Sequence, residues 1–555
     1  MATEPAPPAP SRQGRMRRRL LPPVLALAAG VAVALAFPPF GVLPGLFGFA
    51  LILHLSETAE PSRPLRSAFW RGWLAGLGFF LVSTWWVYEA FQVDAAEQGW
   101  MAPFAVLLLA GGLAMFWGLV GLFYRLIAPA GIACLLVFTG LLVGAEWLRG
   151  NLLTGFPWDL PGEAWRAGSA PSQTAALVGA YGLSWVTVAI AASPALLIER
   201  ARRRAGAVAC IVAALVLAGL YGFGLQRLAH AAPVPADAPV VRVVQSGLPE
   251  IARYDQASYQ TAVRTHVDLT ARPAARTPDI VVWPERSIPG AFDDYLKLGT
   301  WTREAVTAAL KPGQILITGG YRSDVAPPGV YAPDGLAYYN SLLVVQREGA
   351  ALEPLALYDK YRLVPFGEYL PLARWLAPLH VEELVHVGSG FSHGPKPRPL
   401  MLDTAPAVQP LICYEALYPG FTRAGAIASG HRAAWIVNDS DDAWFGGTYG
   451  PVQSLNLASY RAIEEGLPMV RATPTGVSAV IDAYGRSPDA LRLGQGRAGV
   501  IDAPLPAALA PTTYDHLGEG PFVVMMLLSL AGVLWSGASD RIEKLMTAGK
   551  TYRKA

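Results

Sequence analysis

The sequence predicts a helical membrane bundle joined to one large water-exposed α/β domain. Only 15% of the 555 residues are charged, whereas soluble domains carry roughly 25%. The mean hydropathy is +0.34, and the apolar residues of the first half gather in long stretches without Asp, Glu, Lys or Arg. From Pro239 onward, short β-rich runs bounded by Pro, Gly and Asp replace them. A net charge of +3 without a basic stripe argues against nucleic acid as a partner.

Seven charge-free stretches together have room for eight membrane spans, each of which takes about 17–25 residues. Residues 20–56 fit two spans, because Phe37-Pro38-Pro39-Phe40-Gly41 interrupts them as a turn would. The other six are expected over residues 72–88, 98–124, 126–145, 167–198, 205–226 and 520–539. The predicted domains are a seven-span bundle (20–227), an extracytoplasmic domain (228–519), an eighth helix (520–539) and basic cytoplasmic tails (1–19 and 540–555).

The distribution of basic residues predicts the orientation of the bundle. With the N-terminus inside, the inner segments carry 18 Lys and Arg residues, whereas the short outer loops carry only Arg149 and Arg166. Both termini then face the cytoplasm. Arg17-Arg18-Arg19, the apolar run after it and Ala34-Leu35-Ala36 also fit a cleaved signal peptide. Cleavage would leave the remaining topology unchanged, and the mass of the intact protein distinguishes the two cases.

The polar half of the chain has the pattern of a layered α/β domain. Many of its runs are apolar on consecutive positions, which is typical of strands buried on both faces. Helices are expected between some of them, over residues 259–270 and 302–310 for example, and this arrangement predicts packed layers of helix and sheet. Strands are expected over residues 240–244, 280–283, 315–318, 342–345, 411–413, 435–437, 468–471 and 477–481.

Three segments of this domain place a reactive side chain where a buried strand ends. They are Trp283-Pro284-Glu285, Lys360 with the following Leu363-Val364-Pro365-Phe366-Gly367-Glu368, and Cys413-Tyr414-Glu415. Open α/β sheets bind their ligands at strand ends. Singly, such a Glu is usually solvated, a loop Lys is usually a surface charge, and a Cys is usually a packing residue, as we expect for Cys134 and Cys210 in apolar runs. The combination in this order is far more specific.

These segments resemble the three catalytic motifs of the nitrilase superfamily. The chain further resembles the apolipoprotein N-acyltransferase family in its eight spans and in three segments: Ala443-Trp444-Phe445-Gly446, Gly476-Val477-Ser478-Ala479-Val480-Ile481 and the outer-loop Gly155-Phe156-Pro157-Trp158. This resemblance implies an α-β-β-α sandwich fold. It also implies transfer of an acyl chain from a phospholipid, with phosphatidylethanolamine the expected donor, to the N-terminal amine of a diacylated apolipoprotein. That reaction is the last step of bacterial lipoprotein maturation, and the resemblance implies a monomer in the inner membrane with a periplasmic catalytic domain.

The resemblance also implies a role for each matching residue. Glu285 matches the general base, Lys360 the cation that stabilises the transition state, and Cys413 the nucleophile that forms a thioester in a ping-pong mechanism. Accessory positions near the site are matched by Glu368, Tyr414, Glu415 and Trp444. One position departs from the family pattern, because Asp441 stands where Asn is usual. No metal ion and no cofactor are expected.

Three other functions fit parts of the pattern. A membrane-anchored C–N hydrolase of small amides would carry the same Glu, Lys and Cys, and hydrolysis of a soluble amide without lipid would identify it. A transporter with an outer binding domain would be expected to carry charges inside its spans, and the expected spans have none. An inactive lipoprotein-binding scaffold would not need all three reactive residues. The spans themselves favour a lipid acyl donor, with residues 375–379 and Trp444-Phe445 as candidate lipid contacts.

Overall fold

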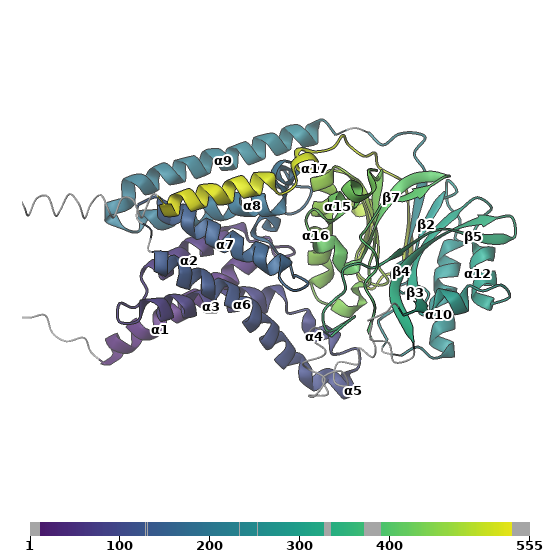
Figure 1. Cartoon of the computed structure of the whole chain (residues 1–555), viewed down its shortest axis with the longest axis horizontal. Helices are drawn as coiled ribbons and strands as arrows, with labels where there is room; N and C mark the ends of the chain where they lie inside the picture. The colour runs from purple at the N-terminus through teal and green to yellow at the C-terminus, as the bar shows by residue number, and fades with distance from the viewer. Residues whose placement is uncertain are drawn as a thin grey trace, which may run out of the picture.

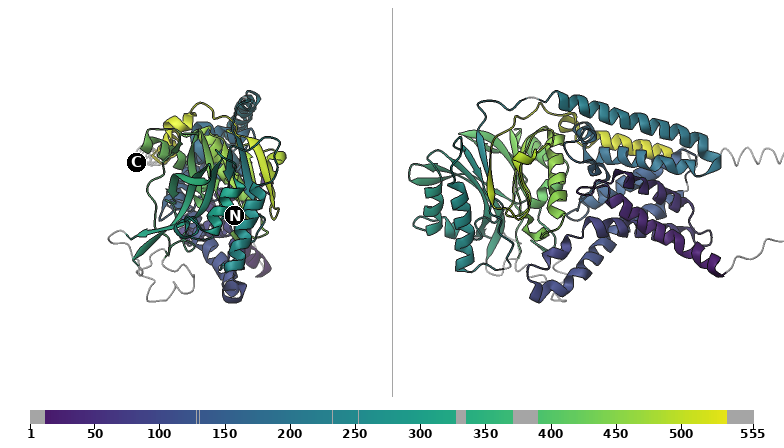
Figure 2. Two further views of the ribbon diagram at one scale, coloured as in Figure 1. Left: turned by 90° about the vertical axis from the view of Figure 1, so that its right-hand side faces the viewer. Right: turned by 180° about the vertical axis from the view of Figure 1, so that it is seen from behind.

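The structure is a computed structural model that describes residues 12–127, 129, 131–231, 233–251, 253–326, 335–370 and 390–534, with only the backbone of residues 12–19. A helical half and a β-sandwich lie end to end along the long axis of the molecule (Figures 1 and 2). The candidate lipid contact at residues 375–379, the C-terminal tail and most of the N-terminal tail lie outside the described residues.

The helical half is built from long apolar helices. The principal ones are α1 (Arg12–Ala34), α2 (Gly48–Glu57), α3 (Pro64–Ser83), α6 (Ala102–Ile127), α7 (Ala133–Asn151), α8 (Ala175–Ala192) and α9 (Arg203–Ala229). Short helices α4 (Val87–Ala90) and α5 (Ala95–Gln98) join α3 to α6, and a further helix covers Gly520–Leu534. The predicted turn at residues 37–41 separates α1 from the segment that leads into α2.

Four helical segments of the described chain are long and apolar enough to cross a membrane. They cover Ala95–Ile127, Ala133–Asn151, Pro171–Leu197 and Arg200–Ala229. Three further apolar helices, at Leu20–Ala34, Leu43–Glu57 and Gly520–Leu534, are shorter than 18 residues. Four of the eight expected spans thus have a helix long and apolar enough to cross a membrane, and the other four stay a prediction.

The predicted span at residues 126–145 is misplaced, because charged residues do not end the helix. Helix α6 continues to Ile127 and α7 occupies Ala133–Asn151, so it contains Glu146 and Arg149. These two side chains form a buried ion pair, and Glu146 also accepts a hydrogen bond from Trp117 Nε1 at 2.6 Å. A charge that is paired and hydrogen-bonded can be buried at tolerable cost. A search for charge-free windows therefore places the end of the helix too early.

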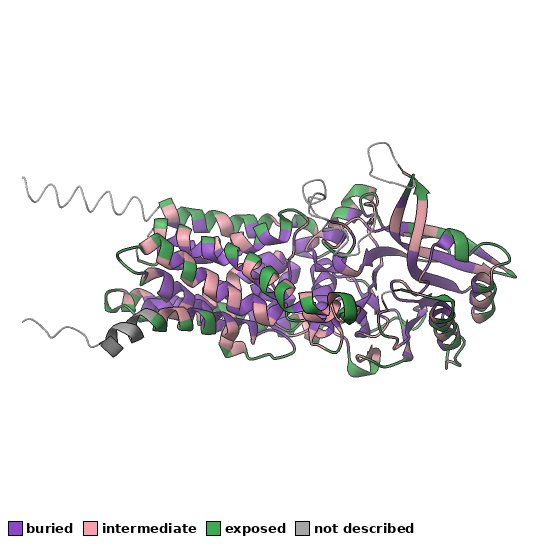
Figure 3. Ribbon diagram, turned by 90° about the horizontal axis from the view of Figure 1, so that it is seen from below, coloured by how far each residue is buried: buried purple, intermediate pink, exposed green. Residues whose placement is uncertain are grey.

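The outer surface of the helical half is apolar. Large side chains of α6 and α9 are fully or largely exposed, with Leu108 at 76% and Leu215 at 67%. Figure 3 shows exposed residues along the outward sides of the helices, whereas the strands of the sandwich are mostly buried. A continuous apolar surface of this kind marks contact with lipid rather than water.

The sandwich consists of two six-stranded sheets. The first has the order β12-β1-β2-β3-β4-β5 and the second β11-β10-β9-β8-β7-β6. Strands β1, β2 and β3 are parallel neighbours, and so are β7, β8 and β9. The strands are β1 (Val240–Gln245), β2 (Ile280–Val282), β3 (Ile315–Val325), β4 (Leu336–Glu348), β5 (Ala351–Asp359), β6 (Leu400–Leu402), β7 (Ala405–Ile412), β8 (Trp435–Asp439), β9 (Met469–Ala472), β10 (Ser478–Ile481), β11 (Arg492–Leu493) and β12 (Gly499–Pro504).

Alternating side chains of the central strands divide the core into three layers. Ile280 and Val282 pack between the sheets with Val437 of the second sheet, whereas Val281 faces the helices outside the first sheet. Ile436 faces the helices outside the second sheet. The outer helices are α10 (Gln256–Thr270), α11 (Phe292–Tyr295) and α12 (Trp301–Ala309) on the first sheet, and α15 (Phe421–Ser429) and α16 (Gly450–Glu465) on the second, followed by α17 (Thr513–Leu517). The predicted α-β-β-α sandwich is therefore present.

Helix α16 joins the two halves of the molecule. One side of it packs on the second sheet, where Leu457 and Ala458 belong to the core. Its other side binds a loop of the helical half, since Asn456 Nδ2 donates to the carbonyl of Glu163 at 2.9 Å and Tyr460 Oη donates to the carbonyl of Gly162 at 2.9 Å. This contact places the second sheet, and not the first, beside the membrane half (Figure 1).

Candidate active site

The three reactive side chains named by the sequence lie beyond the ends of three strands. Glu285 follows β2 of the first sheet, Lys360 directly follows β5 at the edge of the same sheet, and Cys413 directly follows β7 of the second sheet. The site therefore draws on both sheets and lies where their ends meet.

Glu285 is buried and held on both carboxylate oxygens. Oε1 accepts a hydrogen bond from Asn340 Nδ2 at 2.7 Å and lies 3.4 Å from Lys360 Nζ, while Oε2 accepts one from the backbone N–H of Asp441 at 2.8 Å. The residue is 5% exposed. These contacts fix the orientation of the carboxylate, as a proton acceptor requires.

Lys360 lies between two carboxylates. Its Nζ donates to Glu368 Oε1 at 2.8 Å and is paired with Glu285, and the side chain is 1% exposed. Burial alone would lower the pKa of this ammonium group, but the charges of Glu285 and Glu368 outweigh burial and raise the pKa above its usual value. Lys360 is thus a permanent cation in the site.

Asn340 of β4 is a site residue that the sequence reasoning missed. Its side-chain Nδ2 donates both to Glu285 and to Glu368. Its backbone carbonyl oxygen accepts the backbone N–H of Lys360 at 2.8 Å. One amide therefore ties the Glu and Lys segments together. The predicted strand began at residue 342, so Asn340 fell outside it. A polar residue inside a longer strand would have been the available signal.

Cys413 has an unusual backbone. Its φ is 47°, and it opens the short helical turn η8 (Cys413–Leu417), so the strand direction breaks at this residue and the side chain is only partly covered. Burial raises the pKa of the Cys413 thiol, and the carboxylate of Glu285 raises it further, whereas Lys360 and the hydroxyl of Ser440 act in the opposite direction. The resting side chain is a neutral thiol within the electrostatic reach of both Glu285 and Lys360.

Glu415 supports the turn that carries Cys413. Its Oε1 accepts hydrogen bonds from Tyr358 Oη at 2.7 Å and from the backbone N–H groups of Tyr361 at 2.9 Å and Arg362 at 3.1 Å. Its Oε2 accepts the N–H of Ile412 at 2.8 Å. Burial raises the pKa of Glu415 to about 7, although these hydrogen bonds act to lower it. This side chain binds the Lys segment to the Cys segment and does not touch the reacting groups.

A second group of acids lies behind Glu285. Glu250 forms an ion pair with Arg286 at 2.5 Å and hydrogen-bonds the carboxyl group of Asp441. Burial and the charge of Glu250 raise the pKa of Asp441 well above its usual value. Burial and the charge of Glu285 likewise raise the pKa of Asp439. At residue 441 a carboxyl group of raised pKa thus lies where an Asn was expected.

Aromatic side chains of the helical half pack against the turns that contain Tyr414 and Phe445. Tyr414 donates a hydrogen bond to the carbonyl oxygen of Gly155, and its ring stacks on Phe156 with the centroids 6.4 Å apart. Trp86, just before α4, packs against Phe445 at 4.5 Å and against Trp158 at 4.8 Å. The predicted accessory residue Trp444, in the turn η9 (Asp442–Phe445), is 36% exposed.

Comparison with known proteins agrees with this arrangement. Residues 29–193 match the family model of the apolipoprotein N-acyltransferase N-terminal domain, and residues 241–513 match that of the carbon-nitrogen hydrolases. Proteins named apolipoprotein N-acyltransferase are similar over most of their length. The one from Caulobacter vibrioides is 50% identical over 96% of this chain and 97% of its own, and the one from Rhodopseudomonas palustris is 37% identical over 92% and 94%.

Among solved structures, an amidase from Nesterenkonia sp. AN1, with an acetamide moiety added to its active-site cysteine, is 19% identical over 49% of this chain and 94% of its own, with a TM-score of 0.33. The relatives that match over the full length carry the assignment. The chain therefore belongs to the apolipoprotein N-acyltransferase family, whose members are acyltransferases with a catalytic domain of the nitrilase superfamily.

Proposed function

We propose that the protein moves an acyl chain from a membrane phospholipid to the N-terminal amine of a diacylglyceryl-cysteine on an apolipoprotein, through a thioester on Cys413. The observation that carries this proposal is the contact between Glu285 and Lys360, 3.4 Å apart, with both groups in electrostatic reach of the thiol of the half-buried Cys413. A base, a cation and a nucleophile in one pocket are the parts that acyl transfer needs.

In the first half-reaction, the Cys413 sulfur attacks the ester carbonyl carbon of the phospholipid while its proton passes to Glu285. The negative charge that develops on the carbonyl oxygen is stabilised by Lys360, an interaction of a kind often worth about 3–4 kcal/mol. The C–O bond then breaks, and the leaving alkoxide of the lysophospholipid takes the proton from Glu285. The raised pKa of the thiol is consistent with proton removal at the moment of attack rather than with a stored thiolate.

In the second half-reaction, the amine of the apolipoprotein attacks the thioester carbon. Glu285 accepts a proton from the amine, the C–S bond breaks, and the sulfur recovers a proton, so that the amide product and the resting thiol are formed. The acyl group passes through the enzyme, which makes the scheme ping-pong. Phosphatidylethanolamine is the donor we expect, and we place the sandwich on the periplasmic side of the inner membrane of a monomeric enzyme.

The position of the site supports a lipid donor. The turns that carry Cys413 and Phe445 lie on the side of the sandwich that packs against the outer loops of the helical half. Trp86, Phe156 and Trp158 line that junction, so an acyl chain that leaves the bilayer would meet aromatic side chains before it reaches the sulfur. A soluble amidase has no use for such a junction.

The test is the detection of the acyl-enzyme. Full-length protein in detergent is incubated with phosphatidylethanolamine that carries a labelled acyl chain, and intact-mass and peptide mass spectrometry then locate the label. We expect a thioester on Cys413, its discharge by an amine-bearing lipopeptide, and no label in Cys413→Ala. A labelled Cys413→Ala protein would contradict the proposal, and hydrolysis of soluble amides with no acylation by lipid would favour the C–N hydrolase alternative.

A further inference from the structure

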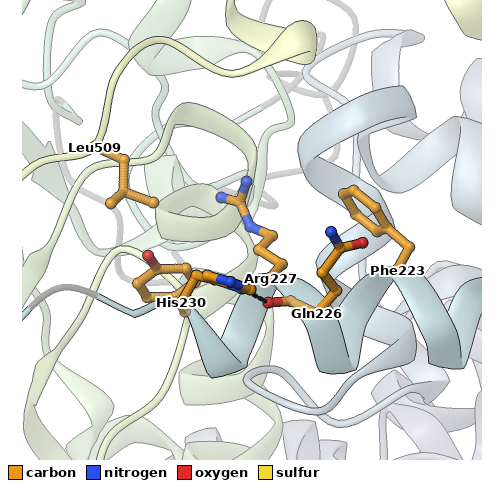
Figure 4. Close-up of a pocket in the computed structure, with 6 residues that line it drawn as sticks. Phe223, Gln226, Arg227, His230 and Leu509 are labelled. Carbon is orange, nitrogen blue, oxygen red and sulfur yellow. Dashed lines mark hydrogen bonds between the residues drawn. The ribbon is translucent and has the colours of Figure 1, made fainter.

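A cavity of about 360 Å³ lies where the sandwich end of α9 meets the catalytic domain, and it shares no residue with the site described above. Phe223, Gln226, Arg227 and His230 of the α9 end form one wall at helical spacing. Tyr484 and Leu509 of the sandwich form the other. Figure 4 shows the guanidinium group of Arg227 projecting away from α9 towards Leu509.

Arg227 carries a charge that the described residues do not neutralise. Its Nε donates to Gln173 Oε1 at 3.2 Å, and its Cζ lies 5.3 Å from the centroid of the Tyr484 ring, but its buried Nη2 has no hydrogen-bond partner. Arg486, on the same ring at 5.1 Å, is paired with Asp482. No carboxylate pairs with Arg227 in the part of the chain that the structure describes. Because an unpaired, partly buried charge is unfavourable, a guanidinium group in this position favours the binding of an anion.

The cation is held in a fixed position. Gln173, which orients its Nε, is fully buried and donates from Nε2 to the carbonyl oxygen of Tyr484 at 2.9 Å. The helical half and the sandwich thus jointly orient the guanidinium group. Planar guanidinium groups held in this way bind phosphate oxygens in a bidentate manner.

The surroundings select an anion that bears acyl chains. Helix α9 is part of a 30-residue apolar segment, and only 17% of its apolar 18-residue window is buried in the protein. Its exposed side chains continue away from the cavity as an apolar surface, with Leu225 at 61%, Leu215 at 67% and Ile211 at 61%. The cavity lies at the end of a lipid-facing helix. Phospholipid headgroups lie at this level of a membrane.

We infer that this cavity binds the phosphate group of a phospholipid, with Arg227 as the phosphate ligand and the acyl chains along α9. The bound lipid is not the acyl donor, because the cavity contains neither Cys413 nor its partners. It would fasten the catalytic domain to the outer leaflet on the side where Tyr484 and Leu509 meet α9. The inference does not depend on the proposed reaction.

The test counts bound lipid on the full-length protein with the Cys413→Ala substitution, so that turnover cannot interfere. Detergent-solubilised protein is titrated with phosphatidylglycerol and analysed by native mass spectrometry. Arg227→Gln removes the charge, and Arg204→Gln removes a charge from the other end of the same helix as a matched control. We expect one retained lipid with the native arginine and with Arg204→Gln, and at least about tenfold weaker retention with Arg227→Gln, the loss of a charge-assisted hydrogen bond.

Two competitors identify the ligand. Dioleoylglycerol, which lacks the phosphate, should not displace phosphatidylglycerol, and millimolar inorganic phosphate should leave it bound. Equal retention in Arg227→Gln, or displacement by dioleoylglycerol, would overturn the phosphate assignment, and displacement by inorganic phosphate would overturn the lipid assignment. If Arg227→Gln does not fold, Phe223→Trp, which fills the cavity and keeps the charge, must show the same loss. Thioester formation on the parent protein tests the proposed function separately.

Discussion

At the scale of single residues, Glu285, the proposed base, makes ionisation of the Cys413 thiol less favourable. After burial, the largest influence that raises its pKa is the carboxylate of Glu285, and Lys360 only partly offsets it. The neutral thiol therefore persists to higher pH than a free cysteine, and the thiolate fraction grows about tenfold per pH unit below the raised pKa.

Replacing Glu285 should consequently change two reactivities in opposite directions. Glu285→Gln removes the proton acceptor and should lower the rate of acylation by phospholipid by about 10²–10⁴-fold. It also removes a negative charge beside the sulfur, which lowers the thiol pKa, so alkylation of Cys413 by iodoacetamide at a fixed pH should become faster. Both rates are measured by mass spectrometry. Equal losses of acylation and alkylation would indicate a collapsed site and contradict this account.

Asp441 provides a second test at this scale. Folding raises its pKa, so the stability that this group contributes is greatest below the unfolded pKa and is lost as the pH rises through the folded value. Asp441→Asn keeps a side-chain acceptor for the N–H of Ala443 and gives Glu250 a permanent hydrogen-bond donor. The backbone N–H of residue 441 still donates to Glu285. The variant should stay active and lose less stability than the native protein as the pH rises above the usual range of an aspartate, by on the order of 1–3 kcal/mol.

Thermal unfolding in detergent at several pH values measures this difference. Asp403→Asn, at an exposed position, is the matched control and should follow the native protein at every pH. An Asp441→Asn protein whose apparent Tm falls with pH as steeply as that of the native protein would show that residue 441 is not the buried acid involved.

At the scale of elements, the sequence predicted the central strands and missed the edges. The strands that hold Val282, Ile412 and Val437 are apolar on both faces, and hydropathy alone locates them. Strand β5 is largely exposed along its middle at the edge of its sheet, and β12 joins β1 from 260 residues downstream (Arg242 opposite Asp502), so neither has such a signal. Motifs located Glu285, Lys360 and Cys413, whereas Asn340 reaches the site from a strand whose start was predicted too late, and Glu250 reaches it through a tertiary contact without a local motif.

Strand β3 contains a position where only glycine fits. A Cβ atom on Gly319 would lie 2.5 Å from Asp439 Oδ2 and 2.6 Å from the Cα of Glu285. Gly319→Ala should therefore displace the backbone of Glu285 and reduce acylation by about 10²-fold, because small misplacements of catalytic groups are costly. Gly494→Ala, which meets no atom within 4 Å, is the control. Native acylation rates in Gly319→Ala would show that Glu285 need not keep its position.

At the scale of the whole molecule, the sandwich and the helical half share their polar contacts as well as their apolar ones. The carboxylate of Glu464 on α16 accepts the backbone N–H of Ala180 on α8 at 2.8 Å, and Gln453 donates to Asp159 at 2.9 Å. Every residue of α16 except Val452 is buried. The catalytic domain is therefore not a soluble unit tied to a membrane anchor, since its second layer of helices is completed by the loops of the membrane half.

The buried ion network at this junction should control the stability of the whole protein. Arg461 of α16 lies 2.8 Å from Glu464 and 3.5 Å from Glu163 of the helical half, and all three side chains are fully buried. Glu163→Gln removes one of the two acidic partners of the arginine, and breaking a buried pair in this way costs about 3–5 kcal/mol. We expect a clear fall in apparent Tm and faster proteolysis of both halves together, measured in detergent against Glu353→Gln at an exposed position. Loss of the sandwich with the helical half intact would contradict a shared core, because it would mean that the two halves unfold independently.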